Sequence, residues 1–461
     1  MLPTTNGTGL NVSAALNQAV REHAAGRLPV AARLYRSVLE VDPANAEALS
    51  NLGFLLGEIK QFGEAEAMLR RALAQHPRHP PALVNLALVL QQRRNFAEAI
   101  GVCERALQSV SDTRNRQKLM NTLALCLAES ERYDEALALL AKMTAAHPRF
   151  ATGHHMTGMA YAKKGEYEAA LCAFKRASEI DPRNPESFLA AGECLLLQRR
   201  ADAALEKLER ALSLNRYDVR ALALKTLALA ELGRTDEEKW LSDPYRLVHF
   251  HRFAELGLSD ERIAELNREL SEFASNEPSL REDPPEYATH KAWHSTTNLF
   301  ELTHPALEEL KGFISYAFKQ RIASLKEEDR DHPFVKATPT QCHIDLWAIK
   351  MKGGGNLHPH IHKDGWLSGV YYVDVPAVVN DVNAREPGWL KIGTPRRDIQ
   401  LSREPVTRSV KPEPGMMVTF PSYFWHDTMP LPEDNTEQRL CLAFDVCPMP
   451  STTAPGRKAV P

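Results

Sequence analysis

A period of 34 residues constrains the fold of this chain more than any other feature. Pro43 and Pro77, and again Pro148 and Pro182, close helical segments 34 positions apart. A frame of this length gives units that begin near residues 12, 46, 80, 117, 151, 185 and 219, with three extra residues before the fourth. A fixed period of this size predicts stacked helical units that bury their apolar faces only against their neighbours.

Small residues recur in this frame where the second helix of each unit must approach the first. These residues are Ala31, Ala65, Ala99, Ala136, Ala170 and Ala204. Gly53, Gly158 and Gly192 occupy the close-packed position of the first helix. The seventh unit is incomplete, because its second helix dissolves into TDEEKWLSDP.

This pattern resembles the tetratricopeptide repeat over about residues 12–235. The resemblance implies an all-α superhelix whose concave groove binds an extended peptide or a partner protein.

The periodicity is lost after Pro244, and a second texture follows. Residues 257–276 and 304–328 are predicted to be helices. From about residue 335, short runs of β-forming residues alternate with Gly, Pro and Asn, and the triple glycine 353–355 predicts a hairpin turn. We therefore expect a multidomain chain, with the superhelix followed by a double-stranded β-helix (jelly-roll) barrel and flanking helices.

The run HPHIHKDGWLSGVYYVDV, residues 358–375, contains the first candidate metal ligands. His362 and Asp364 are two apart on a predicted strand, so their side chains leave from one face. His426 lies at the end of another predicted strand. Two histidines and a carboxylate are the ligand set of non-haem Fe(II) oxygenases. His360 shares the face of His362, so the spacing leaves open that His360 is the ligand instead.

Another His-x-Asp pair, His343 and Asp345, lacks the SGVYY strand behind it and is interpreted as a core or rim pair. Further on, QRLCLAFDV alternates, so that Arg439, Cys441 and Ala443 face one way. An arginine followed by two small residues leaves room for a dicarboxylate and offers it a bidentate partner.

Together these residues resemble the Fe(II)/2-oxoglutarate-dependent dioxygenase superfamily over roughly residues 285–448, and more narrowly a bacterial and phage group with the run H-x-H…LSGVYY. The resemblance implies that His362, Asp364 and His426 bind iron and act in catalysis. It also implies that Arg439 anchors 2-oxoglutarate, that Tyr372 hydrogen-bonds the same carboxylate, and that O2 is the cosubstrate.

Composition narrows the possible partners and location. A formal charge of −3 and a pI near 6.6 give no electrostatic reason to expect a nucleic acid or an anionic membrane as partner. Seven scattered cysteines favour a reducing compartment, and we find neither a secretory signal nor an apolar run of about 18 residues. The expected location is the cytoplasm.

The predicted organisation has five parts. They are a disordered N-terminus (1–11), a repeat domain (12–240), a helical linker (241–284), an oxygenase-like domain (285–450) and a disordered tail (451–461). The predicted function is hydroxylation of a protein or peptide side chain that the repeat groove recruits. Two alternatives remain: a scaffold with a non-redox or degenerate metal-binding barrel, and an oxygenase that acts on a small molecule.

Overall fold

The computed structural model describes residues 11–59, 61–284, 287–325, 329–381 and 385–449. They form two compact units, which divide between Ala190 and Ala191, inside helix α11. Of the two termini predicted to be disordered, only residue 11 lies among the described residues. Asn11 is ordered there, because its side chain caps the first helix by accepting a hydrogen bond from the Ala14 amide at 3.0 Å.

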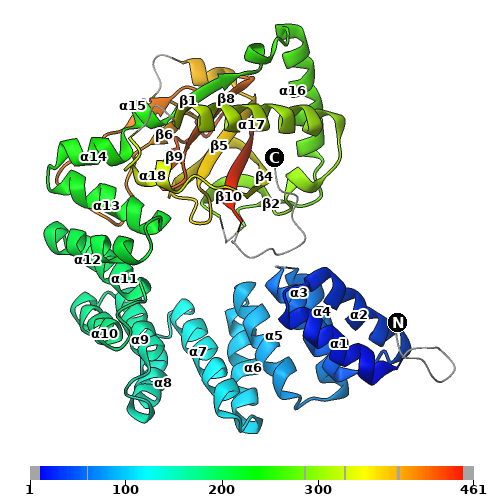
Figure 1. Cartoon of the computed structure of the whole chain (residues 1–461). Coiled ribbons are helices and arrows are strands. Elements are labelled where there is room, and N and C mark those ends of the chain that lie inside the picture. Colours follow the sequence, from blue (N-terminus) through cyan, green and yellow to red (C-terminus); the bar gives the residue numbers. More distant parts are fainter. Residues whose placement is uncertain (1–10, 60, 285–286, 326–328, 382–384, 450–461) are drawn as a thin grey trace. The chain divides into compact units, whose positions relative to one another are not determined.

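The first unit is a series of antiparallel helix pairs (Figure 1). Helices α1 to α10 span Val12–Ala24, Leu28–Val41, Ala46–Glu58, Phe62–Gln75, Pro80–Gln92, Phe96–Ser109, Thr113–Glu129, Tyr133–Ala146, Ala151–Lys164 and Tyr167–Ile180. The first helices of the first, second, third and fifth repeats begin at the predicted residues 12, 46, 80 and 151. The first helix of the fourth repeat begins at Thr113, four residues before the predicted start.

The periodic small residues lie where the two helices of a unit meet. All six alanines of the repeat frame have 0% exposure. A Cβ added to Gly53 would lie 2.6 Å from Cγ of Leu69, and one added to Gly158 would lie 2.5 Å from a ring carbon of Phe174. The predicted close approach of the helices is therefore confirmed at the positions that carried the pattern.

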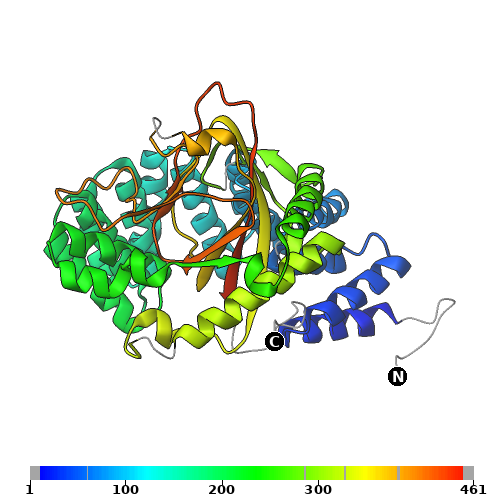
Figure 2. The same cartoon turned by 90° about the horizontal axis from the view of Figure 1, so that it is seen from above.

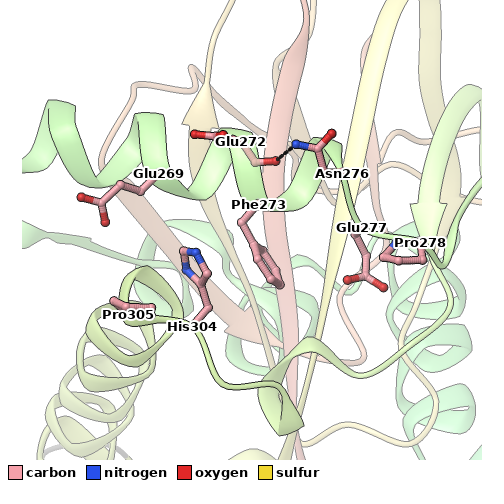
Figure 3. A pocket seen from close by; sticks show the side chains of 8 residues that line it. All are labelled: Glu269, Glu272, Phe273, Asn276, Glu277, Pro278, His304 and Pro305. Carbon is pink, nitrogen blue, oxygen red and sulfur yellow. Dashed lines mark hydrogen bonds between the residues drawn. The ribbon is translucent and has the colours of Figure 1, made fainter.

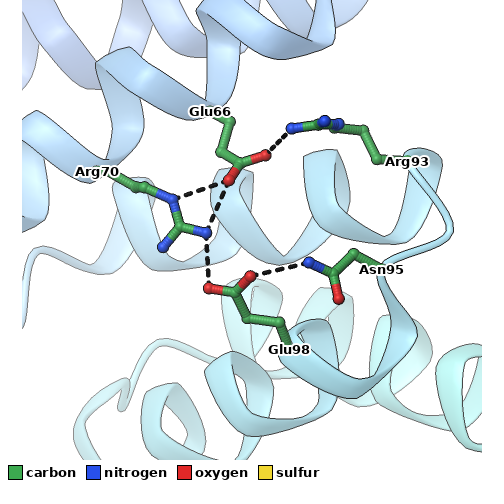
Figure 4. Close-up of polar contacts among 5 residues, drawn as sticks. All are labelled: Glu66, Arg70, Arg93, Asn95 and Glu98. Carbon is green, nitrogen blue, oxygen red and sulfur yellow. Dashed lines mark hydrogen bonds and ion pairs between the residues drawn. The ribbon is translucent and has the colours of Figure 1, made fainter.

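Polar residues on the surface connect the second and third repeats (Figure 4). Arg70 lies 2.7 Å from carboxylate oxygens of both Glu66 and Glu98, while Arg93 pairs with Glu66 and Asn95 donates to Glu98 at 2.9 Å. Such exposed pairs contribute little singly, but this network joins α4 to α6 and adds to the apolar packing between neighbours.

The second unit begins with the remaining repeat helices. These are most of α11 (Glu186–Leu197), then α12 (Ala201–Leu214), α13 (Val219–Glu231), α14 (Thr235–Ser242) and α15 (Pro244–Leu247). The prediction that the seventh repeat lacks a regular second helix is wrong, because α14 is present, although it has only 8 residues. It ends where Asp243 takes an extended backbone before Pro244, as the steric restriction on residues that precede proline requires.

One antiparallel sheet forms the core of this unit. Its strands are β1 His249–Arg252, β2 Leu280–Glu282, β3 Thr289–Ser295, β4 Cys342–His360, β5 Leu367–Asp374, β6 Leu390–Ile392, β7 Arg408–Val410, β8 Met416–Pro421, β9 His426–Thr428 and β10 Arg439–Pro448. The strand order is β1-β8-β5-β10-β4-β9-β6-β7; in addition, β3 pairs with β4, and β2 pairs with β3. Figures 1 and 2 show that this sheet is curled.

Residues 241–284, which we predicted to be a helical linker, contribute strands to this sheet. Strand β1 pairs with β8, and β2 pairs with β3. These strands have 4 and 3 residues, too short for an alternating pattern to reveal them in the sequence.

Helices α16 (Asp260–Ser275) and α17 (Pro305–Ser324) lie on the outer side of the sheet (Figure 2). Their bounds are close to those of the two helices predicted at residues 257–276 and 304–328. Tyr371 of β5 points toward them: its hydroxyl donates to Asn267 at 2.6 Å, and its ring contacts Phe313. Because side chains alternate along a strand, Tyr372 points to the inner face.

The prediction of a hairpin turn at residues 353–355 is wrong. Strand β4 continues through these glycines to His360. Gly354 has a φ of +74°, and a Cβ on Gly353 would lie 2.3 Å from the carbonyl oxygen of Glu433. The glycines therefore let the segment around Glu433 pack directly against the strand.

The predicted fold class is confirmed as a helical repeat superhelix followed by a curled antiparallel β-domain with flanking helices. Within the described ranges, no helix combines the length and the apolar character that crossing a membrane requires.

Candidate metal centre

Three imidazoles converge at one end of the sheet. His360 ends β4 and lies opposite His426, which begins β9, while His362 follows two residues after His360. Each histidine places one ligand nitrogen within 4.8 Å of those of the other two. The ring centroids are 4.2 Å apart for His360 and His426, 5.2 Å for His360 and His362, and 4.9 Å for His362 and His426.

Hydrogen bonds fix which nitrogen each ring offers. Nδ1 of His360 lies 2.7 Å from the carbonyl oxygen of His358, and Nδ1 of His426 lies 2.9 Å from that of Phe424. Nδ1 of His362 lies 2.6 Å from Oδ1 of Asp445. All three partners only accept, so each Nδ1 carries the proton and donates it. The lone pair that remains on every ring is at Nε2.

The environment keeps two of these rings neutral. Burial, together with the neighbouring imidazoles, lowers the pKa of His360 to about 3 and holds the pKa of His426 well below its usual value. Neutral imidazole is the form that binds a metal ion. These histidines therefore need no deprotonation to act as ligands near pH 7.

A carboxylate on β10 orients the third ring. Besides accepting from His362, Oδ1 of Asp445 accepts from the hydroxyl of Ser368 at 2.6 Å, and that hydroxyl lies 2.8 Å from the hydroxyl of Ser422. A carboxylate behind a ligating histidine fixes the ring and raises its basicity. Sequence reasoning did not name Asp445 or Ser368, although Asp445 continues the inward alternation of Arg439, Cys441 and Ala443.

Asp364 is not among the described residues whose ligand atoms converge within 4.8 Å. Strand β4 ends at His360 and β5 begins at Leu367, so the prediction that His362 and Asp364 share a strand is wrong. Residues 363 and 364 form a turn, and Asp364 is exposed. A turn does not alternate side chains with a period of two, so the spacing argument fails here. The ligand role predicted for Asp364 remains a prediction that this geometry does not support.

Arg439 and Tyr372 lie together on the inner face. Arg439 is 1% exposed; its Nε donates to the carbonyl oxygen of Gly388 at 2.9 Å, and its guanidinium lies 5.2 Å from the ring centroid of Tyr372. Among the described residues, Arg439 forms no ion pair with a carboxylate, and the buried hydroxyl of Tyr372 has no hydrogen-bond partner. Burial raises the pKa of Tyr372, so its hydroxyl stays protonated. A buried guanidinium beside an unsatisfied hydroxyl suits an anionic ligand.

Small and apolar side chains separate this pair from the histidines. On β10 the inward positions between Arg439 and Asp445 are Cys441 and Ala443, opposite Tyr372 and Val370 of β5. Trp347 of β4 lies opposite Ala443 and contacts the ring of His362, with centroids 5.5 Å apart. The inner face therefore carries a positive charge at Arg439, uncharged side chains in the middle and potential metal ligands at the histidines.

Helices α13 and α14 hold the segments that carry the histidines. Trp425 donates from Nε1 to the carbonyl oxygen of Ala223 at 3.0 Å, and Tyr423 donates to that of Leu241 at 2.6 Å. Tyr217, just before α13, donates to the carbonyl oxygen of Trp366 at 3.0 Å. Because Trp425 adjoins His426 and Trp366 follows the turn after His362, the last repeat helices help to position both.

The donor set fits a divalent transition metal. Imidazole nitrogen suits Fe(II) as well as Zn and Cu, and three ligands on one side leave positions open for other molecules. His360, His362 and His426 would hold the ion, and Asp445 would support it from behind.

A separate cavity of about 520 Å³ lies between α16 and the start of α17 (Figure 3). It is lined by Glu269, Glu272, Phe273, Asn276, Glu277, Pro278, His304 and Pro305. None of the residues described above lines it, and we assign it no role.

Comparison with protein families matches both parts of the chain. Residues 345–445 match the family described as "Putative 2OG-Fe(II) oxygenase". Residues 22–83 and 80–149 match families described as "Tetratricopeptide repeat", and residues 158–199 match one described as "TPR repeat". No curated protein matches the chain.

Solved structures resemble the helical part. They include a tetratricopeptide repeat protein from Parabacteroides merdae ATCC 43184, with 19% identity, a TM-score of 0.42 and coverage of 48% of this chain and 86% of that one. YrrB, described as a TPR protein with an unusual peptide-binding site, has 23% identity and a TM-score of 0.32 over 42% of this chain and 98% of its own. The type IV pilus biogenesis factor PilW has 19% identity and a TM-score of 0.42 over 46% of this chain and 96% of its own.

The chain therefore combines N-terminal tetratricopeptide repeats with a C-terminal domain of the family described as "Putative 2OG-Fe(II) oxygenase".

Proposed function

We propose that this protein is an Fe(II)- and 2-oxoglutarate-dependent oxygenase whose iron is held by His360, His362 and His426. The observation that carries the proposal is the convergence of three imidazoles whose Nδ1 atoms are all engaged with acceptors. The family match over residues 345–445 supports the choice of iron and 2-oxoglutarate. When bound, the iron supplies the redox chemistry that activates O2.

The residues of the chain bind and orient the cosubstrate. We assign to Arg439 the far carboxylate of 2-oxoglutarate, because its guanidinium is buried and forms no ion pair with a carboxylate among the described residues. Tyr372 would donate its unsatisfied hydroxyl to the same carboxylate. Cys441 and Ala443 leave room for the carbon chain between Arg439 and the histidines.

Aromatic rings cover part of the proposed iron site, in which His360 and His362 are part-buried. Phe420 contacts the ring of His426, with centroids 4.8 Å apart, and Trp347 contacts that of His362. Burial of Arg439 strengthens its interaction with an anion, because the local dielectric constant is low.

For the substrate, we propose a side chain of a protein or peptide that the repeats recruit. Stacked helical repeats present extended surfaces of the kind that bind peptides. A cytoplasmic location also remains a proposal; it is supported by the seven cysteines, all of which lie in the described part of the chain and none of which forms a disulfide there.

The test is formation of succinate from 2-oxoglutarate by the purified full chain. Turnover that needs both added Fe(II) and O2, and that is lost in His426→Ala, supports the proposal. Equal turnover by wild type and His426→Ala, or none with iron bound at the histidines, contradicts it. Tryptophan fluorescence of each variant verifies that the second unit is folded.

A further inference from the structure

A second group of potential ligands lies where β4 begins and β10 ends. His343, Asp345 and Cys447 each place one ligand atom within 4.8 Å of the other two. In the pairing of these strands, Cys447 lies opposite His343, and Asp345 follows two residues along. Directly opposed residues and residues two apart point to the same side of a sheet, so the grouping is built into the strand register.

A neighbouring amide orients the carboxylate of this group. Asn298 donates from Nδ2 to Oδ1 of Asp345 at 2.9 Å, while Oδ2 of Asp345 lies 3.5 Å from Nε2 of His343. One carboxylate oxygen is thus held from behind and the other is directed into the group. Polar partners that orient a ligand in this way are a regular feature of metal sites.

The exposure of the three side chains suits an ion that enters from solvent. Cys447 is a buried residue, whereas His343 and Asp345 are part-buried, with 13% and 35% of their side-chain surface exposed. The thiol therefore lies at the bottom, and the imidazole and carboxylate lie at the rim.

We propose that His343, Asp345 and Cys447 form a second metal site, which binds Zn²⁺ and leaves one position to water. A thiolate, an imidazole and a carboxylate are the ligand types of zinc, whereas Mg²⁺ and Ca²⁺ take oxygen ligands. Bound zinc would join the end of β10 to the start of β4, beside Asp445, which lies opposite Asp345. The site shares no residue with the three histidines, so it does not depend on the proposed oxygenase activity.

The sulfur ligand gives the site a spectroscopic signature. Co²⁺ replaces Zn²⁺ in tetrahedral sites, and a cobalt–thiolate bond adds a charge-transfer band in the near ultraviolet. The three-histidine centre contains no sulfur and cannot produce this band. The experiment is titration of the metal-free full chain with Co²⁺, followed by displacement with Zn²⁺.

We expect the wild type to show the thiolate band and to lose it when Zn²⁺ is added. Cys447→Ser abolishes the band. Cys342→Ser is the matched control. Cys342 is also buried, but it lies one residue before His343 on β4 and opposite Pro448, so its side chain points to the other side of the sheet and the band persists. His360→Ala also keeps the band, which separates this proposal from the three-histidine centre.

If Cys447→Ser does not fold, Asp345→Asn and His343→Ala at the rim provide the same readout, as a weakening of Co²⁺ binding by at least tenfold. Absence of the band in the folded wild type overturns the proposal. A band that survives Cys447→Ser and disappears in Cys342→Ser overturns it as well.

Discussion

At the scale of single residues, Asp445 fixes the orientation of the His362 ring. It accepts from Nδ1 of His362 at 2.6 Å and is held in turn by Ser368. We predict that Asp445→Asn weakens the affinity of the three-histidine centre for Mn²⁺ by about 10- to 100-fold, because loss of the carboxylate frees the ring and lowers its basicity. Titration followed by electron paramagnetic resonance measures the affinity. Asp374→Asn is the control, since Asp374 bonds Ser271 and Gln438 instead; equal affinity of Asp445→Asn and wild type would refute the role.

Arg439 is the proposed anchor for the far carboxylate of 2-oxoglutarate. Its planar fork is buried beside Tyr372, and a lysine there offers a point charge without the bidentate geometry. We predict that Arg439→Lys raises the KM for 2-oxoglutarate on the order of 100-fold and leaves Mn²⁺ affinity unchanged. Steady-state kinetics test this, with Arg252→Lys, an exposed ion pair to Glu413, as the control. An unchanged KM would show that the cosubstrate is anchored elsewhere.

The lowered pKa of His360 predicts how the stability of the metal-free protein depends on pH. Below pH 6.5 the unfolded chain protonates this imidazole, while the folded chain does so only near pH 3. The unfolded state therefore binds more protons in this window, so the free energy of unfolding falls as the pH falls from about 6.5 toward 3. Partial exposure of the ring limits the effect to an order of 1 kcal/mol at pH 5.

Urea unfolding at pH 7 and pH 5 measures this effect. His360→Asn is expected to lose less stability between the two pH values than wild type, whereas His290→Asn, at an exposed position on β3, behaves as wild type. The same loss in His360→Asn as in wild type would contradict the assigned protonation.

At the scale of helices and strands, the β-domain depends on the last repeat helices. Trp425 bonds Ala223, Tyr217 bonds Trp366, and Glu238 accepts from the Val406 amide at 2.7 Å. A fragment of residues 183–449 keeps these partners and should fold and bind Mn²⁺. A fragment of residues 241–449 loses them, leaving buried polar groups unpaired at about 1–3 kcal/mol each. We predict that it does not fold; thermal unfolding decides this, and equal midpoints would contradict the dependence.

The sequence predicted helices and strands best where a pattern repeated many times or where β-forming residues were grouped. Seven repeats at a nearly fixed spacing specify the helices, and short runs of β-forming residues indicate β4, β5, β8 and β10. It failed for β1 and β2, which are too short to alternate, and at Gly353–Gly355, where the glycines serve a tertiary contact with Glu433. It also failed between β4 and β5, where a strand pattern was extended through a turn and placed Asp364 beside His362.

The site was predictable as a set of residue types but not as a geometry. The motif and the alternation named His362, His426 and Arg439 as candidates and left His360 as an alternative to His362, whereas the structure brings His360, His362 and His426 together. The pairing of His360 with His426 across β4 and β9 is a long-range register that local sequence does not fix.

At the scale of the whole molecule, the two units can be followed separately. Tryptophan occurs at positions 240, 293, 347, 366, 389 and 425, all in the second unit. Metal binding stabilises only the folded form of the unit that binds it. We predict that Mn²⁺ raises the unfolding midpoint seen by tryptophan fluorescence and leaves that of a fragment of residues 11–185, followed by circular dichroism, unchanged. A metal-induced shift in that fragment would show that the repeats bind the ion themselves.

The central claim is that three histidines, without a carboxylate, form the metal centre. The most direct test is Mn²⁺ affinity, measured by electron paramagnetic resonance, in His360→Ala and Asp364→Ala of the full chain. Mn²⁺ is redox-stable, and the thiolate-containing group at Cys447 does not favour it. The account predicts that His360→Ala loses affinity by at least tenfold and that Asp364→Ala binds as wild type. Normal binding by His360→Ala together with loss in Asp364→Ala would contradict it.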